Sequence, residues 1–161
     1  MARYEMEFER RKDLGQGVRL SATLMALIAG AIFGLTSAAA PINEFAGAAS
    51  LALLFCGAMF LVASVWYLAL SHVGHEYSYV GFADEFQAIR ERDRLSGTSW
   101  AQVDVSTEVS LITEYSACSS FNQRTNDLKS TYLHRANHKV VWPIFFVFAA
   151  GFVQACDRVA I

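Results

Sequence analysis

Long runs without a charged residue dominate the hydropathy pattern of this chain. No Asp, Glu, Lys or Arg occurs from Leu20 to Asn43 or from Phe45 to Ser71, and a third such run extends from Val140 to Cys156. A helix needs about 20 apolar residues to cross a hydrocarbon core roughly 30 Å thick, and the third run is just long enough. The pattern therefore predicts three transmembrane helices.

The stretch between the second and third runs contains no proline and predicts further helices. Apolar residues recur at helical spacing from Glu76 to Arg94, which indicates an amphipathic helix that continues or closely follows the second span; they are Tyr79, Phe82, Phe86 and Ile89. The residues after Leu95 indicate a turn, and Asp104 or Ser106 can cap the next helix.

That next helix carries a broken apolar stripe made of Val109, Ile112, Tyr115, Phe121, Leu128 and Tyr132. We expect it to run unbroken into the third span. The alternative is a break within Ser116–Thr131, because serine, asparagine and threonine have modest helix propensity.

The sequence thus predicts an all-α polytopic membrane protein with three transmembrane helices and a helical cytoplasmic hairpin or stalk between the second and third. Residues 1–19 form an amphipathic cytoplasmic segment and residues 20–71 a transmembrane hairpin. Residues 72–139 form the cytoplasmic helical region, and residues 140–161 form the third transmembrane helix with a short outer tail.

The basic residues indicate the orientation, because lysine and arginine stay on the cytoplasmic side. Five precede the first span, seven lie between the second and third, and only Arg158 follows the last. The amino terminus and the long polar region are therefore expected in the cytoplasm. The Pro41–Glu44 turn and the Asp157–Ile161 tail are expected outside.

Composition and motifs exclude several function classes. The net charge of −2 provides no basic field for general duplex DNA binding. No charged residue lies inside a predicted span, so the usual mark of an ion-coupled transporter is missing from the sequence. Neither G-x-S-x-G nor H-E-x-x-H occurs, and we expect neither an enzyme nor a bound cofactor.

The first predicted span repeats a small residue every four positions, at Ala22, Ala26, Gly30, Gly34 and Ala38. Small residues let helix backbones approach closely in lipid, so this is a packing face. Two partners fit it: the second span of the same chain, or another subunit.

Two further polar features lie in or beside the spans. Gln154 is deep in the third span, where it can hydrogen-bond between helices or line a pore. His72 and His75 end the second span, while His134 and His138 precede the third. Their spacing makes a metal site conceivable, but interfacial histidines commonly contact headgroups, and we predict no metal site.

The best candidates for ligand binding form a polar, basic cluster: Asn122, Arg124, Asn126, Lys129 and Arg135. Three of them share one helical face, where amides can hydrogen-bond a partner helix or a polar ligand and bases can hold a phosphate. The alternative is a solvated face that merely continues the basic flank of the membrane.

The architecture and the pattern Tyr115…Asn122-Gln-Arg-Thr-Asn126…Lys129…Tyr132-Leu…Ala136 resemble small bacterial membrane effectors of anti-phage systems. These are the SLATT-type proteins that accompany nucleotide-signalling enzymes, and the related Hailong membrane effector. The resemblance implies an inner-membrane homo-oligomer that permeabilises the membrane when a nucleotide or oligonucleotide signal, or the enzyme that makes it, changes its state.

We therefore expect a homo-oligomeric channel or pore effector surrounded by membrane lipid and controlled at its cytoplasmic helices. The alternative is a non-conducting accessory or assembly subunit that docks another protein at the membrane. Exposed aromatic residues in the polar region would anchor such a partner.

Overall fold

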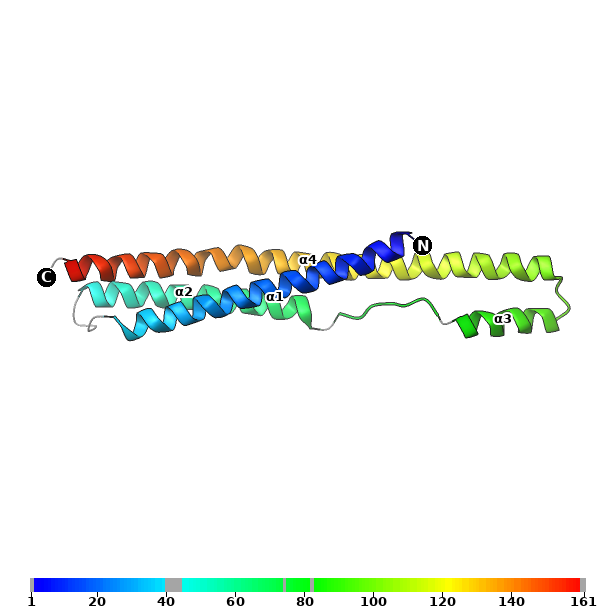
Figure 1. The fold of residues 1–161 in the computed structure, drawn as a ribbon, viewed down its shortest axis with the longest axis horizontal. Helices are drawn as coiled ribbons and strands as arrows, with labels where there is room; N and C mark the ends of the chain where they lie inside the picture. Colours follow the sequence, from blue (N-terminus) through cyan, green and yellow to red (C-terminus); the bar gives the residue numbers. More distant parts are fainter. Residues whose placement is uncertain (1, 40–44, 74, 82, 160–161) are drawn as a thin grey trace. The chain divides into compact units, whose positions relative to one another are not determined.

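The computed structural model describes residues 2–39, 45–73, 75–81 and 83–159. It contains four helices: α1 (Ala2–Ser37), α2 (Phe45–His72), α3 (Ala83–Leu95) and α4 (Trp100–Val159) (Figure 1). None of the described residues forms a strand, so the predicted all-α class is confirmed. The predicted outer turn Pro41–Glu44 and the last two residues of the tail lie outside the described residues.

Three of the helices are long and apolar enough to cross a membrane, namely α1, α2 and α4. Helix α4 is continuous over 60 residues and carries Pro143 within it. The polar stretch Ser116–Thr131 is helical throughout, which confirms the expectation of an unbroken helix. Tertiary contacts of its polar side chains, described below, outweigh their modest propensity.

Helix α4 begins earlier than the predicted caps at Asp104 and Ser106. Ser99 precedes its first turn, and the Ser99 hydroxyl donates to Gln102 Oε1 at 2.9 Å. Serine followed three residues later by glutamine is a capping-box pattern, and this signal marks the true start. Gly97 ends the preceding turn with φ of 86°, a left-handed conformation that glycine adopts without strain.

The amphipathic helix predicted from Glu76 to Arg94 is wrong in its first part. Residues 75–81 are not helical, and α3 begins only at Ala83. Tyr79 therefore lies in an extended segment, while Phe82 is outside the described residues. Side chains of α4 supply hydrogen bonds to this segment's backbone, which removes the need for a helical ladder.

The chain divides into two compact units, which differ from the predicted segments in their boundaries. Unit 1 comprises Met1–Lys12 and His75–Asp127, and unit 2 comprises Asp13–Gly74 and Leu128–Ile161. Helices α1 and α4 each contribute to both units. The parts of α1 and α4 that belong to unit 1 do not include any of the charge-free runs. All three runs therefore belong to unit 2.

In unit 1, α3 packs back against the start of α4. Phe86 and Val103 are buried, and Arg90 forms an ion pair with Asp104. The Arg94 guanidinium lies 4.7 Å from the centre of the Trp100 ring, in a cation–π contact. These contacts show a helical hairpin in this unit, in agreement with the sequence.

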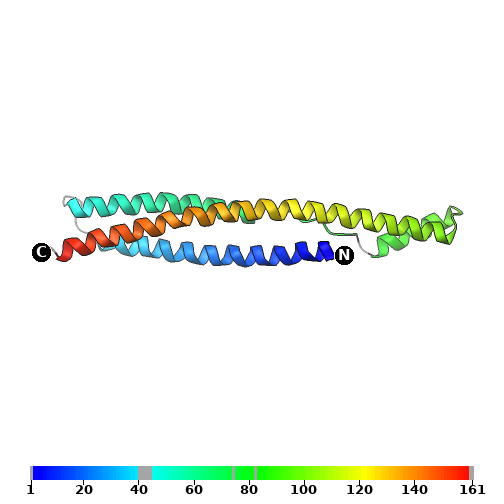
Figure 2. The same ribbon diagram turned by 90° about the horizontal axis from the view of Figure 1, so that it is seen from above.

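In unit 2, α2 packs through a stripe of residues spaced alternately by three and four. The buried members are Gly47, Ser50, Leu54, Gly57, Leu61, Ser64 and Ser71. Every seventh position is a serine or glycine, from Ser50 to Ser71. A seven-residue repeat of small side chains lets neighbouring helices approach closely, and Figures 1 and 2 show α2 beside the second half of α4 and the later part of α1.

The core of unit 2 joins all three helices. Met25 and Ile28 of α1 meet Leu61 of α2 and Ala136 and Val140 of α4. Between α2 and α4, a Cβ added to Gly57 would lie 3.2 Å from Phe146 Cβ and 3.8 Å from Pro143 Cα. Even a methyl group at Gly57 would therefore require its neighbours on α4 to shift by a few tenths of an ångström.

Replacing Gly57 by leucine should lower the stability of the purified protein. Forcing a side chain into this contact costs about 1–3 kcal/mol in packed cores. Thermal unfolding followed by circular dichroism measures the effect. Gly15→Leu is the matched control, because a Cβ at Gly15 would meet nothing within 4 Å. Equal melting temperatures for the two variants would contradict the contact.

Candidate functional site

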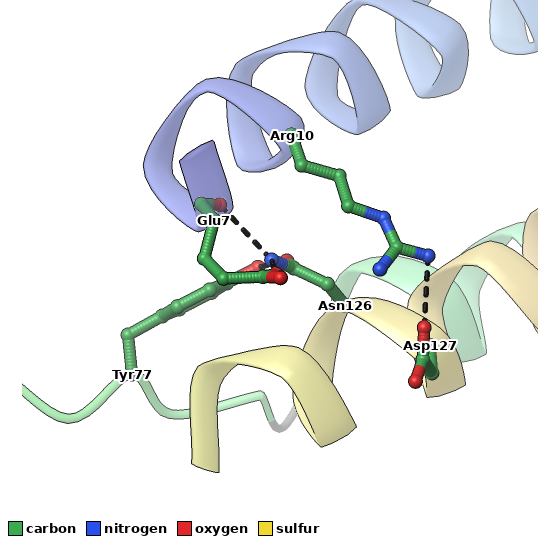
Figure 3. A network of polar contacts seen from close by, with 5 residues as sticks. All are labelled: Glu7, Arg10, Tyr77, Asn126 and Asp127. Carbon is green, nitrogen blue, oxygen red and sulfur yellow. Dashed lines mark hydrogen bonds and ion pairs between the residues drawn. The ribbon is translucent and has the colours of Figure 1, made fainter. Parts of the chain in front are cut away.

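The most elaborate polar site of the described residues lies in unit 1, around Asn126 of α4. Figure 3 shows Asn126 facing Glu7 of α1 and Tyr77 of the extended segment. The Asn126 Nδ2 group donates to Glu7 Oε2 at 2.8 Å and to the Glu7 carbonyl at 3.0 Å. Its Oδ1 accepts from the Tyr77 hydroxyl at 2.7 Å. One amide thus joins three segments of the chain.

Asn122, one turn earlier on α4, holds the backbone of the extended segment. Its Oδ1 accepts from the Ser78 amide and its Nδ2 donates to the Ser78 carbonyl, both at 2.9 Å. An asparagine side chain has one acceptor oxygen and one donor amine, so it can pair with both backbone groups of one residue as a strand would. We call Glu7, Tyr77, Ser78, Asn122 and Asn126 the polar junction.

Neighbouring side chains of α4 extend this arrangement along the segment. The Gly81 amide donates to Glu114 Oε1 at 2.7 Å, and the Thr125 hydroxyl donates to the Glu76 carbonyl at 3.3 Å. The Ser78 hydroxyl is 3.3 Å from the sulfur of Cys118, which is buried. Side chains of α4 therefore form hydrogen bonds with the backbone of this segment, as a neighbouring strand would in a sheet.

The side chains at the centre of the junction are buried. Asn126 is 0% exposed, Asn122 1% and Glu7 8%. Buried polar groups cost free energy when left unpaired, so every lost bond here is more costly than a surface bond. The junction therefore specifies how the amino-terminal turns of α1 and the extended segment pack on α4 within unit 1.

Charged groups at the rim of the junction contribute less. Arg10 donates to Asp127 Oδ1 at 2.8 Å, with side-chain exposures of 40% and 55% (Figure 3). Such exposed pairs are typically worth about 0–1 kcal/mol. Arg11 donates to the Tyr79 hydroxyl at 2.8 Å, and its guanidinium lies 4.3 Å from the centre of the Tyr77 ring.

Burial raises the pKa of Tyr77 above its ordinary value, although the Arg11 guanidinium beside the ring opposes this shift. The folded chain thus holds the Tyr77 proton more tightly than the unfolded chain does. This contribution to stability is complete below the ordinary tyrosine pKa and is lost as the pH rises through the raised one. At neutral pH the hydroxyl remains a donor to Asn126.

The five predicted ligand contacts fall in different places. Asn122 and Asn126 are buried in the junction, with their amides engaged inside the chain. Arg124 is exposed in unit 1. Lys129 and Arg135 belong to unit 2, where Arg135 lines a pocket with both histidines of the second pair. The two amides therefore belong to the polar junction of unit 1, whereas Lys129 and Arg135 belong to unit 2.

The described residues bring no further candidate metal ligand to the histidine pairs. Among the described residues, no group of three or more His, Cys, Asp or Glu side chains is placed to hold a metal ion. His134 and His138 line a pocket that contains no carboxylate or thiol. These two histidines are placed beside bases.

In unit 2, Gln154 makes hydrogen bonds between helices, which was one of its two expected roles. Its Nε2 donates to the Leu35 carbonyl of α1 at 3.1 Å and to the Ser50 hydroxyl of α2 at 2.7 Å. With 9% exposure, it ties three helices together. A pore-lining role remains a prediction.

The small-residue face is exposed along α1, while Ala38, which follows this helix, lies beside the end of α4. All its members are exposed: Ala22, Ala26, Gly30, Gly34 and Ala38. A Cβ added at Gly30 or Gly34 would meet nothing within 4 Å. The opposite stripe, with Ser21, Met25 and Ile28, is the buried one. Packing of the small-residue face against α2 of the same chain, one of the two expected roles, is therefore wrong.

Sequence reasoning missed Glu7 and Tyr77. Glu7 lies among charged residues of the amino-terminal turns, and such residues are normally expected at the surface. No pattern in the sequence indicates that Glu7 is buried. The small-residue repeat of α2 could have been found, because Ser50, Gly57, Ser64 and Ser71 recur at strict seven-residue spacing.

Exchanging the donor and the acceptor between Asn126 and Glu7 should show that the two side chains contribute jointly to the free energy of unfolding. Asn126→Asp places a second carboxylate against Glu7 and should cost about 3 kcal/mol, since a buried charge loses its partner. Adding Glu7→Gln restores a donor facing an acceptor and should recover part of that loss. Denaturant unfolding of both single variants and the double variant measures the coupling.

Arg10→Gln is the surface control, for which we expect a loss of less than about 1 kcal/mol. Purely additive effects of the two junction substitutions, or an Asn126→Asp variant as stable as the control, would contradict the described contact.

Comparison with known proteins adds no relative to this picture. No protein-family model, curated protein sequence or solved structure matches the chain. The resemblance to anti-phage membrane effectors therefore rests on architecture and a short residue pattern, and the function is argued from the contacts of the chain itself.

Proposed function

We propose that the protein is a homo-oligomeric channel or pore-forming effector of a bacterial inner membrane, controlled at its cytoplasmic helices. The observation that carries the proposal is the exposed small-residue face of α1. A face that admits close helix approach, yet meets no helix of its own chain at Gly30 and Gly34, is available to another copy there.

The buried polar groups of unit 2 support a conducting path between subunits rather than one through a single chain. Gln154 and Ser50 bond to each other, and the Ser21 hydroxyl donates to Asn137 Oδ1 at 2.7 Å. The Gln154–Ser50 pair and the apolar core are buried among the three helices, whereas Asn137 is exposed. A conducting path would therefore lie between subunits, lined by small residues and apolar constrictions that gate by excluding water.

The proposed orientation places unit 1 in the cytoplasm. The carboxyl-terminal end of α4 faces outward. The distribution of basic residues supports this, since all but Arg158 lie on one side of the apolar runs. A control signal then reaches unit 1 from the cytoplasm. It opens the assembly only if it binds open and closed packings with different affinity.

Arg124 and Lys129 remain the candidate contacts for an anionic control ligand, each within its own unit. Arg124 is exposed and suits a phosphate or carboxylate through its planar guanidinium. The resemblance to anti-phage effectors supports a nucleotide or oligonucleotide as that ligand, or the enzyme that makes it. The polar junction supplies a second control element, because it fixes residues 75–81 through breakable hydrogen bonds.

Replacing Gly30 and Gly34 together by leucine should block assembly without unfolding the subunit. The new side chains enter open space in the monomer but fill a contact between copies. Native mass should fall from an oligomer of three or more copies to a monomer, and ion leak from liposomes should drop at least about tenfold.

Gly15→Leu is the matched control, since it adds the same side chain in open space on the same helix. An unchanged oligomer in the Gly30/Gly34 variant would remove the small-residue face from the interface. A monomeric wild-type protein would remove the proposed assembly itself.

Charge reversal at Arg124 should change control without changing assembly. We expect Arg124→Glu, and separately Lys129→Glu, to alter depolarisation of expressing bacteria about tenfold, because a charge-assisted bond is worth about 1.5–3 kcal/mol. Arg92→Glu is the control, as Arg92 is a highly exposed arginine of unit 1. Variants indistinguishable from that control would exclude both residues as ligand contacts.

A specific observation favours a second function, that of a non-conducting accessory subunit. Helix α4 carries an exposed apolar stripe in unit 1, where Val105, Val109 and Ile112 are 57–61% exposed at helical spacing. Such a stripe fits an apolar helix of another protein. A stoichiometric complex with a different protein, together with no ion leak, would establish this function in place of the channel.

A further inference from the structure

A basic pocket lies in unit 2 between α2 and α4, apart from the polar junction. Its volume is about 320 Å³, and its lining is Tyr67 of α2 with His134, Arg135, His138 and Lys139 of α4. Ligand pockets are typically about 300–1,000 Å³, so the space suits a small polar group. No acidic residue lines it.

Helical spacing brings the bases together. His134 and His138 are four residues apart, as are Arg135 and Lys139, so each pair occupies adjacent turns. Among the described residues, neither Arg135 nor Lys139 has a carboxylate partner. The positive charge of this pocket is therefore not balanced within the described chain.

Two aromatic rings of α2 lie beside the bases: Tyr67 lines the pocket, and Phe60, which does not line it, lies next to Lys139. Tyr67 packs against the core of unit 2, and the Lys139 ammonium lies 5.8 Å from the centre of the Phe60 ring. Phe60 and Tyr67 are seven residues apart and share one face of α2. These two rings place apolar surface beside the bases, an arrangement typical of a membrane interface.

The pocket also lies where the apolar runs end. Tyr67 is four residues from the end of the charge-free run Phe45–Ser71, and Lys139 immediately precedes the run Val140–Cys156. A group bound here would sit at the headgroup level of a bilayer that covers those runs. Basic pockets between membrane helices at this level bind phosphorylated headgroups.

We infer that this pocket binds the phosphate of an anionic phospholipid. The Arg135 guanidinium supplies paired donors to two phosphate oxygens, Lys139 supplies a point charge, and the Tyr67 hydroxyl supplies a further donor. Water-soluble phosphates share this chemistry, but the neighbouring aromatic rings and the position beside the apolar runs favour a lipid. The inference holds whether or not the protein conducts ions.

Native mass spectrometry of the full-length protein in detergent tests the inference. The probes are phosphatidylglycerol, phosphatidylcholine with the same acyl chains, and inorganic phosphate. We expect wild-type protein to retain phosphatidylglycerol in preference to phosphatidylcholine. The double variant Arg135→Gln/Lys139→Gln should lose about tenfold or more of its phosphatidylglycerol affinity.

Arg19→Gln is the matched control, because Arg19 is an exposed base immediately before the first apolar run and does not line the pocket. It should bind phosphatidylglycerol as the wild type does. Equal losses in the control and the pocket variant would assign lipid preference to general surface charge and overturn the inference. Absence of any phosphatidylglycerol preference would also overturn it.

A milder variant guards against loss of fold. Tyr67→Phe keeps the ring in the core and removes only the hydroxyl, so it should weaken phosphatidylglycerol binding less than the double variant while leaving melting unchanged. Wild-type affinity in both pocket variants would refute the site. Binding of inorganic phosphate without phosphatidylglycerol would overturn the lipid as ligand and assign a water-soluble phosphate.

Discussion

The structure depends on one constraint: a polar group removed from water must keep a hydrogen-bond partner. Asn122 and Asn126 satisfy it in unit 1 by bonding the extended segment and the first turns of α1. Gln154 satisfies it in unit 2 by bonding α1 and α2. Because each bond joins different segments, the requirement that stabilises the amides also determines which segments lie together.

Small side chains provide the second condition for packing. Apolar surface alone gives no preference between a helix and lipid, so helices in a membrane associate where backbones approach closely. Helix α2 uses its small residues inside the chain, at positions such as Gly57, whereas α1 leaves Gly30 and Gly34 exposed. The two small-residue faces thus have different roles, one within the subunit and one toward a neighbour in the proposed assembly.

The two units also differ in how their charges are used. In unit 1, Arg10, Arg90 and Arg94 have partners inside the unit, in an acid or an aromatic ring. In unit 2, Arg135 and Lys139 line a pocket without an acid. Bases that pair inside unit 1 contribute to its packing, while bases without an acid beside the apolar runs favour an external anion, and this difference supports a membrane surface near the pocket.

The sequence by itself determined the helical class, the three apolar helices and the continuity of α4, because local periodicity and hydropathy act over neighbouring residues. It also located the polar cluster on α4. Only the tertiary structure decided that Asn122 and Asn126 face inward, that residues 75–81 are extended, and that the small-residue face of α1 faces outward. Those outcomes depend on bonds between residues up to 119 positions apart, such as Glu7 and Asn126, and no local pattern encodes such pairs.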